Sequence, residues 1–378
     1  MRNPFQYGGV VAGNAFCNRD AERADLLRAI RSHEKLFVFS ERRFGKTSLV
    51  QSVISRLPKK DALAAYVDLW PTDDESSFVN VLARGIALSM STSTQKLLHT
   101  SRTLFSSLVP SLTVNAEGKP EISFGFNKNV KVDTALEDVL QTPARIAKKE
   151  KKTIVVVFDE FQQILEYQSD LVERKLRSVI QGHPQVAYLF LGSRRHLIQK
   201  MFMDKSRPLY RAGGHYPLGP IEEKHWTPFI RNHFKTSGRS ISDELIHSIC
   251  LSTQGHPFYT QHLCHAVWEL GEPRAKVTEK TIRDATELLL KRENYAYTTL
   301  WESFAVNQRK FLKGLASETS KVQPFSAEFI TKHGLGSASN VQRVVESLLE
   351  KDVIDRDNGS FLISDRFFRL WLQGFQIG

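Results

Sequence analysis

The chain has 378 residues, of which 41% are hydrophobic and 25% are charged, and its formal net charge at pH 7 is +11. This length exceeds one compact core and suggests two or three domains of ordinary globular composition, while three scattered cysteines without a C-x-x-C pair indicate neither a disulfide framework nor a zinc site. No apolar run reaches membrane-span length and no signal-peptide segment opens the chain, so we expect a cytoplasmic protein without membrane contact.

The first 220 residues alternate strands with helices, which is typical of a parallel sheet with crossover helices. Short apolar runs predict five strands, at 36–40, 64–69, 153–158, 187–191 and 215–218. Helical patterns lie at 18–31 with Asn18 as N-cap, 48–57, 73–90, 134–150 and 171–181. A Ser/Thr-rich stretch follows residue 89, and period-two apolarity at 111–115 and 121–126 then predicts a β-hairpin, within an insertion of about 105–130.

Strand patterns stop near residue 222. Four helical patterns, at 222–236, 242–253, 257–270 and 278–293, predict a small all-α domain. Three helices, at 306–317, 326–333 and 340–351, and a hairpin at 353–363 then form the outline of a winged helix. A last helix at 365–373 is rich in Phe and Trp and is expected to pack on another domain. We therefore expect domains at 1–220, 221–300 and 301–378.

The first predicted strand runs into a short loop that ends in Gly45-Lys46-Thr47-Ser48. This strand–loop–helix context is that of a P-loop, in which backbone N–H groups bind the β-phosphate. Lys46 would reach the β- and γ-phosphates, and the Thr47 hydroxyl would ligate Mg²⁺. The motif G-x-x-x-x-G-K-[ST] is imperfect because Ser40 occupies its first position.

A second motif follows the strand at 153–158, where the apolar run ends in Asp159 and Glu160. Acidic residues at this edge of a parallel sheet lie where open α/β sheets bind ligands. Asp159 would orient a water on Mg²⁺, and Glu160 would polarise the attacking water. Such a pair alone is typical of a helix N-cap, but its place downstream of a P-loop favours a Walker B pair. Together the two motifs predict an ATPase core that binds ATP or ADP and Mg²⁺.

With these motifs in place, the whole chain resembles the archaeal-type ATPases of the STAND/AAA+ group of P-loop NTPases, which are close in layout to origin-recognition initiators. The resembling segments are Asn3–Phe5, Phe16–Glu22, Arg42–Leu49, Val157–Gln162, Phe190–Ser193, Pro208–Arg211, Leu218–Ile221 and Gly255–Gln261. The resemblance implies an α/β core with a five-stranded parallel sheet, a helical lid and a C-terminal winged helix. The departure is Ser40, where the family usually has glycine.

The resemblance also implies roles by position. Its sensor-1 strand lies between the P-loop and Walker B strands, so that Ser193 and Arg194 would face the γ-phosphate; alternatively, Arg194 and Arg195 begin a solvated helix. The implied catalytic residues are Glu160, Lys46, Ser193 and Arg194. The implied nucleotide-binding residues are Ser40, Arg43, Phe44, Gly45, Lys46, Thr47, Ser48, Arg19, His256 and Pro257. Thr47 and Asp159 would hold Mg²⁺, partly through water.

The lid assignment also has an alternative. His256-Pro257 would contact the nucleotide base or phosphate, or simply begin a helix with proline at its first position. Arg19 would line the adenine pocket. Arg211 is the better candidate for an arginine that acts across a subunit interface.

Two functions fit these observations. The first is an ATP-driven switch, in which Mg-ATP closes the lid, hydrolysis releases it, and the winged helix reports the state to a protein partner or another copy. The alternative is an ATPase that assembles on DNA through its basic core and winged helix. Residues 301–378 carry 10 Lys/Arg and 9 Asp/Glu, so the positive excess lies upstream, where it favours non-specific DNA contact at most. The expected recognition helix offers only Gln342 and Arg343 for base edges, which favours the switch.

Overall fold

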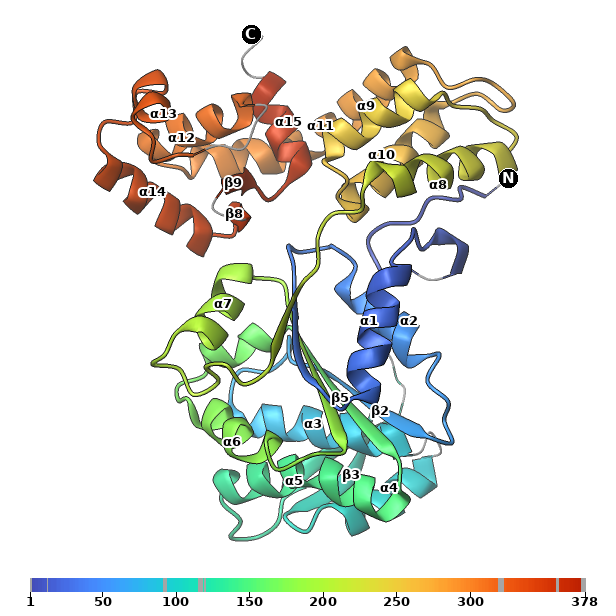
Figure 1. Cartoon of the computed structure of the whole chain (residues 1–378), viewed down its shortest axis with the longest axis vertical. Coiled ribbons are helices and arrows are strands. Elements are labelled where there is room, and N and C mark those ends of the chain that lie inside the picture. The colour runs from blue at the N-terminus through green and yellow to red at the C-terminus, as the bar shows by residue number, and fades with distance from the viewer. Residues whose placement is uncertain are drawn as a thin grey trace. The chain divides into compact units, whose positions relative to one another are not determined.

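The computed structural model describes residues 2–11, 13–90, 94–114, 118, 120–318, 323–357 and 360–374. The chain divides into two compact units, each assembled from separate stretches of sequence (Figure 1). The first unit comprises Met1–Arg19, Glu41–Gly45 and Gly219–Gly378, and the second comprises Asp20–Ser40 and Lys46–Leu218. The chain thus leaves the second unit for the five residues of one loop and then returns to it.

The second unit is built on a parallel sheet, which has five strands in the described part of the chain, in the order β2-β5-β6-β1-β7. These strands are β1 (Lys35–Phe39), β2 (Ala62–Asp68), β5 (Thr153–Asp159), β6 (Val186–Gly192) and β7 (Gly214–Pro217). Val157 of β5 lies opposite Leu189 of β6, and Phe190 of β6 lies opposite Phe37 of β1. The predicted five-stranded parallel sheet is confirmed.

Helices flank this sheet. They are α1 (Asp20–Arg31), α2 (Lys46–Ile54), α3 (Glu75–Met90), α5 (Val132–Glu150), α6 (Leu171–Ile180) and α7 (Arg195–Met203). Gly85 permits the close approach of α3 to β2, because a Cβ at this position would lie 2.8 Å from the Tyr66 carbonyl oxygen. The predicted N-cap at Asn18 is wrong: α1 begins at Asp20, and both Asn18 and Arg19 adopt left-handed backbone conformations.

The predicted hairpin is present as β3 (Leu108–Val114) and β4 (Pro120–Phe126), which pair antiparallel with Leu112 opposite Ile122. Its predicted turn, 116–120, lies outside the described residues except for Gly118 and Pro120. The Ser/Thr-rich stretch contains a helix that was not predicted, α4 (Thr94–Leu104). This helix packs against β3, and its Leu97 is buried, so tertiary contact outweighs the weak local preference of the segment.

The first unit is mainly helical. Its helices and strands are η1 (Gly13–Ala15), α8 (Glu223–Thr236), α9 (Asp243–Thr253), α10 (Pro257–Leu270), α11 (Glu279–Glu302), α12 (Val306–Ser317), α13 (Ala327–Lys332), α14 (Ala338–Glu350), β8 (Ile354–Asp357), β9 (Ser360–Ile363) and α15 (Arg366–Gly374). One apolar core runs through this unit, from Phe5 to Leu372. The turn predicted at Asn358-Gly359 lies outside the described residues.

The helix predicted at 278–293 is longer than expected, because α11 continues to Glu302 without an intervening glycine or proline. The last helix, α15, contacts α9, α11 and α12, and the Trp371 indole N–H donates to Asn294 Oδ1 at 2.8 Å. The last helix therefore packs on other helices of the same unit, and its packing on a separate domain stays a prediction. Among the helices that the structure describes, none combines the length and apolarity needed to cross a membrane.

Candidate nucleotide site

The P-loop begins where β1 ends. Ser40 and Lys46 flank the loop, their exposed fractions are 0% and 5%, and Lys46 Nζ donates a hydrogen bond to Ser40 Oγ at 2.9 Å. Within the loop, Arg43 has φ of +60° and Gly45 has φ of +82°. A left-handed non-glycine residue costs about 1 kcal/mol, so this conformation is held by its surroundings. Successive amides in such a loop can face one anion.

The start of α2 lies beside the Walker B strand. Thr47 Oγ1 donates to Asp159 Oδ2 at 2.7 Å, and the Tyr66 hydroxyl, from the neighbouring strand β2, donates to the same oxygen. The Glu160 amide donates to Asp159 Oδ1 at 2.9 Å. Burial raises the pKa of Asp159 above its ordinary value, and the hydrogen bonds from Tyr66 and Thr47 oppose that rise.

Sequence reasoning missed Tyr66. Its signal was weak: a phenol near the carboxyl end of a strand, whose proximity to Asp159 depends on β2 being next to β5. Burial and the neighbouring Asp159 charge raise the pKa of Tyr66 above its ordinary value, so the hydroxyl stays a donor.

A carboxylate and a hydroxyl meet at the end of β6. Ser193 Oγ donates to Glu160 Oε2 at 2.6 Å, and Gln162 Nε2 donates to the same oxygen. Glu160 itself has φ of +52°, which turns the chain out of β5. Because β6 lies between β1 and β5, the position expected for the sensor-1 strand is confirmed. Gln162 was not predicted as a site residue, although it stands two positions after Glu160 in the Walker B segment.

Arg194 is paired with Glu166 of η2 (Phe161–Glu166), with 3.5 Å between Nη1 and Oε1. Arg195 begins α7 with an exposed fraction of only 7%. The alternative of a solvated helix start is therefore wrong for Arg195, while a γ-phosphate contact by Arg194 stays a prediction. The Arg211 guanidinium lies over the Tyr210 ring, 5.3 Å from its centroid.

His256 caps α10, and Pro257 occupies the first position of that helix. The Phe258 amide donates to His256 Nδ1 at 3.2 Å, so Nε2 carries the ring proton and donates to the Arg42 carbonyl at 3.2 Å. Arg19 is buried, with φ of +76°, and its Nη2 donates to the Gly219 carbonyl at 2.7 Å. These contacts give both residues structural roles, and their nucleotide contacts stay predictions.

The donor set suits a Mg²⁺ ion that keeps most of its waters. No group of three or more His, Cys, Asp or Glu side chains suited to a metal occurs among the described residues. Mg²⁺ in nucleotide sites needs only one or two protein oxygens beside phosphates and water. Thr47 Oγ1 and Asp159 Oδ2, which lie 2.7 Å apart, are the predicted oxygens for such an ion.

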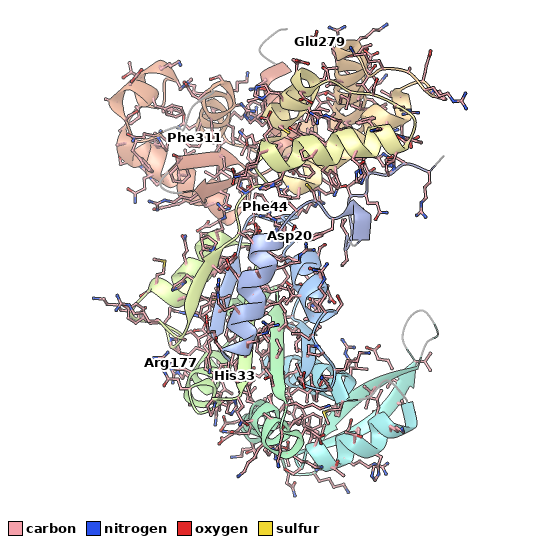
Figure 2. The ribbon with its side chains drawn as sticks, turned by 45° about the vertical axis from the view of Figure 1, so that its right-hand side comes forward. Asp20, His33, Phe44, Arg177, Glu279 and Phe311 are labelled. Atoms are coloured by element: carbon pink, nitrogen blue, oxygen red, sulfur yellow. The ribbon has the colours of Figure 1, made fainter. Side chains whose placement is uncertain are left out.

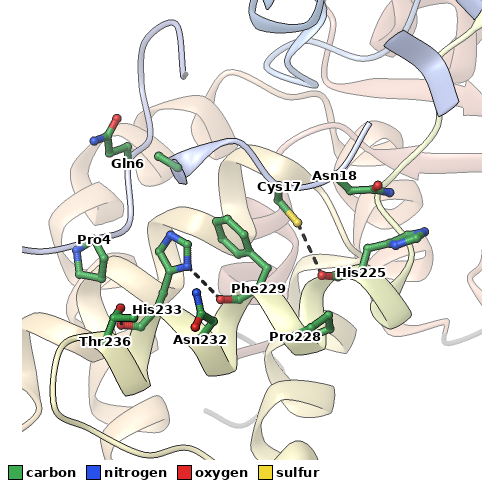
Figure 3. A pocket seen from close by; sticks show the side chains of 11 residues that line it. Pro4, Gln6, Cys17, Asn18, His225, Pro228, Phe229, Asn232, His233 and Thr236 are labelled. Atoms are coloured by element: carbon green, nitrogen blue, oxygen red, sulfur yellow. Dashed lines mark hydrogen bonds between the residues drawn. The ribbon is translucent and has the colours of Figure 1, made fainter. Parts of the chain in front are cut away.

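The first unit contains a separate cavity of about 900 Å³ beside α8 (Figure 3). It is lined by Pro4, Gln6, Ala15, Cys17, Asn18, His225, Pro228, Phe229, Asn232, His233 and Thr236. Burial raises the pKa of Cys17 to about 12, so its thiol is not a nucleophile at neutral pH. None of the residues predicted for nucleotide binding lines this cavity.

Comparisons with solved structures agree with this geometry at the level of the fold. The Walker-type ATPase of Pyrococcus abyssi is 14% identical, with a TM-score of 0.67 over 98% of this chain and 99% of that chain. The ORC2 protein of Aeropyrum pernix, in its ADPNP–ADP complexes, is 11% identical, with a TM-score of 0.52 over 95% of each chain. The ADP form of ORC2 is 12% identical, with a TM-score of 0.51 over 95% of each chain.

A comparison with curated protein sequences found no match. Comparison with protein families found two. Residues 295–374 match a probable winged helix domain, and residues 16–263 match an ATPase domain found predominantly in Archaea. The second match covers most of the chain and contains Lys46, Thr47, Asp159 and Glu160. The chain therefore belongs to the family of ATPase domains found predominantly in Archaea, and is a P-loop ATP hydrolase with a C-terminal winged helix.

Proposed function

We propose that this ATPase is a Mg²⁺-dependent switch, in which the nucleotide state controls the position of helices α8–α11 and of the winged helix, and thereby partner binding. One observation carries the proposal. The loop Glu41–Gly45 groups with the helical unit, although Ser40 and Lys46 on either side group with the sheet. A phosphate that binds this loop therefore acts on residues that belong to the helical unit. The boundaries 1–220, 221–300 and 301–378 remain our predicted division into core, lid and winged helix.

Each residue of the site has a proposed task. Lys46 holds phosphate charge, and Thr47 with Asp159 holds Mg²⁺, which when bound neutralises charge on the phosphates. Glu160 accepts a proton from the attacking water as general base. The Ser193 hydroxyl and the Gln162 amide both donate to Glu160 Oε2, which orients the carboxylate and leaves Oε1 as the oxygen for that water.

Two variants test the assignment of tasks. Lys46→Ala should lose nucleotide binding, because the phosphate charge is no longer matched. Glu160→Gln should bind Mg-ATP normally but hydrolyse it about 10²- to 10⁴-fold more slowly, which is the usual contribution of a general base. Equilibrium binding of a fluorescent nucleotide and phosphate release measure the two properties. Hydrolysis at the parent rate by Glu160→Gln would show that the wrong carboxylate has been assigned.

The switch itself is tested by size-exclusion chromatography and small-angle scattering with ADP and with a slowly hydrolysed ATP analogue. We expect a different radius of gyration or oligomeric state with the two nucleotides in the parent protein, and no difference in Lys46→Ala. Identical profiles for the parent under both conditions would contradict the switch while leaving ATP hydrolysis untouched.

We propose that the winged helix contacts a protein partner or a second copy of the chain. Gln342 and Arg343 are both exposed on α14, but the Gln342 amide donates to Glu346 Oε1 on the same helix at 3.0 Å. The two side chains can therefore form few hydrogen bonds with the edges of DNA bases. Any DNA binding should be independent of sequence and weaken steeply with salt. Fluorescence anisotropy with unrelated duplexes at several salt concentrations tests this, and tight binding to one defined site would contradict it.

A further inference from the structure

The loop Glu41–Gly45 carries a buried ion pair with the C-terminal helix. Arg366, the first residue of α15, lies with Nη1 2.8 Å from Glu41 Oε2 and Nη2 3.1 Å from Glu41 Oε1. The side chains are 3% and 6% exposed, so both charges are almost completely removed from water. The Nη2 contact is a hydrogen bond and the Nη1 contact is an ion pair, and removing either partner would leave the other charge buried and unmatched, which is strongly unfavourable.

Arg366 is itself held firmly. Its Nη1 also donates to the carbonyl oxygens of Ile363 and Ser364, at 2.8 and 3.1 Å, at the end of β9. The start of α15 is fixed by Asp365, whose Oδ1 accepts from the Phe367 and Phe368 amides at 2.8 and 3.0 Å. The guanidinium is therefore a rigid anchor built by the winged helix rather than a mobile surface cation.

The rest of the loop is contacted by the same unit. Arg42 Nη2 lies 3.1 Å from Asp352 Oδ2, and the Arg43 guanidinium lies 4.4 Å from the centroid of the Phe258 ring. Phe44, labelled in Figure 2, is 1% exposed and meets the His256 ring edge-on with 4.4 Å between centroids. Four consecutive loop side chains are thus engaged by the helical unit, and only the Glu41 contact is a buried pair of opposite charges.

We infer that Arg366 is a positioning residue for nucleotide binding: through Glu41 it holds the phosphate-binding loop in the conformation that nucleotide requires. The inference rests on the assignment of this loop to phosphate binding. Amides of a loop with left-handed residues at Arg43 and Gly45 converge on a phosphate only while that backbone conformation is kept. An anchored loop has lost its freedom before nucleotide arrives, so binding does not have to order it.

The expected signature is a change in KM and in nucleotide affinity with little change in kcat. Removing the anchor loosens the loop amides that bind the phosphate shared by ADP and ATP, so Arg366→Gln should raise the Kd of both by about ten- to a hundredfold. Glu160, the carboxylate proposed for the chemical step, belongs to the sheet unit and is oriented there by Ser193 and Gln162, so kcat at saturating ATP should stay within about twofold. Arg366→Lys keeps the charge but loses the planar guanidinium that donates to Glu41 and to the β9 carbonyls at once, and should lie between parent and Arg366→Gln.

The experiment compares the parent, Glu41→Gln, Arg366→Gln, Arg366→Lys and the double variant Glu41→Gln/Arg366→Gln. ADP affinity without metal, ATP turnover with Mg²⁺, and amide hydrogen exchange of the loop are measured for each. If Arg366 acts through Glu41, the double variant is no worse than the weaker-binding single variant, and loop exchange is faster in both single variants. Strictly additive losses in affinity would overturn the inference.

A matched control is the pair Glu173–Arg207 in the sheet unit, where Glu173 is 2% exposed and is ion-paired with Arg207. Glu173→Gln should lower the unfolding temperature but leave nucleotide affinity unchanged. If it raised the Kd as much as Arg366→Gln, the effect would be general destabilisation and the inference would fail. If Arg366→Gln did not fold, Arg366→Lys and Glu41→Gln would still decide the question. Absence of ATPase activity in the parent would instead refute the proposed function.

Discussion

Replacing Ser40 by alanine tests whether the Ser40 hydroxyl holds the Lys46 ammonium before nucleotide binds. Lys46 is 5% exposed, and its ammonium donates to Ser40 Oγ at 2.9 Å, at the position where a glycine would offer no hydroxyl. A hydrogen bond from a charged donor contributes about 1.5–3 kcal/mol. When phosphate arrives, Lys46 turns to its β- and γ-oxygens and this bond weakens. The alanine variant has no such bond to lose, so its nucleotide affinity should rise.

The lower end of that range sets the expected effect, because the ammonium has three donors and can partly keep its contact with Ser40 in the bound state. About 1.4 kcal/mol corresponds to a tenfold decrease in Kd for ADP and ATP. Isothermal titration calorimetry of the parent and Ser40→Ala measures it. Ser52→Ala is the control, because the Ser52 hydroxyl donates to Leu49 within α2. An unchanged or larger Kd in Ser40→Ala would refute the reasoning, since the hydroxyl would then stabilise the nucleotide-bound state at least as much as the nucleotide-free state.

Three further predictions concern the sheet unit. Ser193→Ala removes one of two donors to Glu160 Oε2, so kcat should fall about tenfold in a phosphate-release assay while ADP affinity stays constant; an unchanged kcat would contradict it. Gly192→Ala places a Cβ 2.3 Å from Ile198 Cγ1, so denaturant titration should show a loss of about 1–3 kcal/mol, and parent stability would contradict it. Burial lowers the pKa of His183 from 6.5 to about 4. Between pH 6.5 and about 4, this imidazole is therefore protonated in the unfolded chain but neutral in the folded chain. Stability should therefore fall as pH falls, by up to about 3 kcal/mol from this group, and thermal unfolding of His183→Gln should show a smaller decline than the parent.

The neutral state of His183 also follows from its contacts. Tyr188 OH lies 2.7 Å from Nδ1, and Gln141 Oε1 lies 3.1 Å from Nε2. The phenol donates to Nδ1 while Nε2–H donates to the amide oxygen, which leaves no acceptor for a second ring proton. An unfolding free energy that rose as pH fell below 6.5 would contradict this assignment.

Much of the architecture could be predicted from the sequence because its signals are local. Apolar runs mark the strands, so that β5 and β6 were placed within one or two residues, and the P-loop and Walker B motifs lie at strand ends where chain direction alone sets their position. The misplaced elements are those whose local signal was weak. α4 forms because it packs against β3 and buries Leu97, and α11 continues past residue 293 because no glycine or proline in its sequence ends it.

Only the tertiary structure decided which side chains form hydrogen bonds with the motif residues. Tyr66 reaches Asp159 because β2 pairs with β5, and Ser193 reaches Glu160 because β6 lies on the other side of β5. The Glu41–Arg366 pair joins residues 325 positions apart. Helical and strand periodicities act over a few residues, whereas these contacts depend on strand order and helix packing, which bring together residues with no common pattern in the chain.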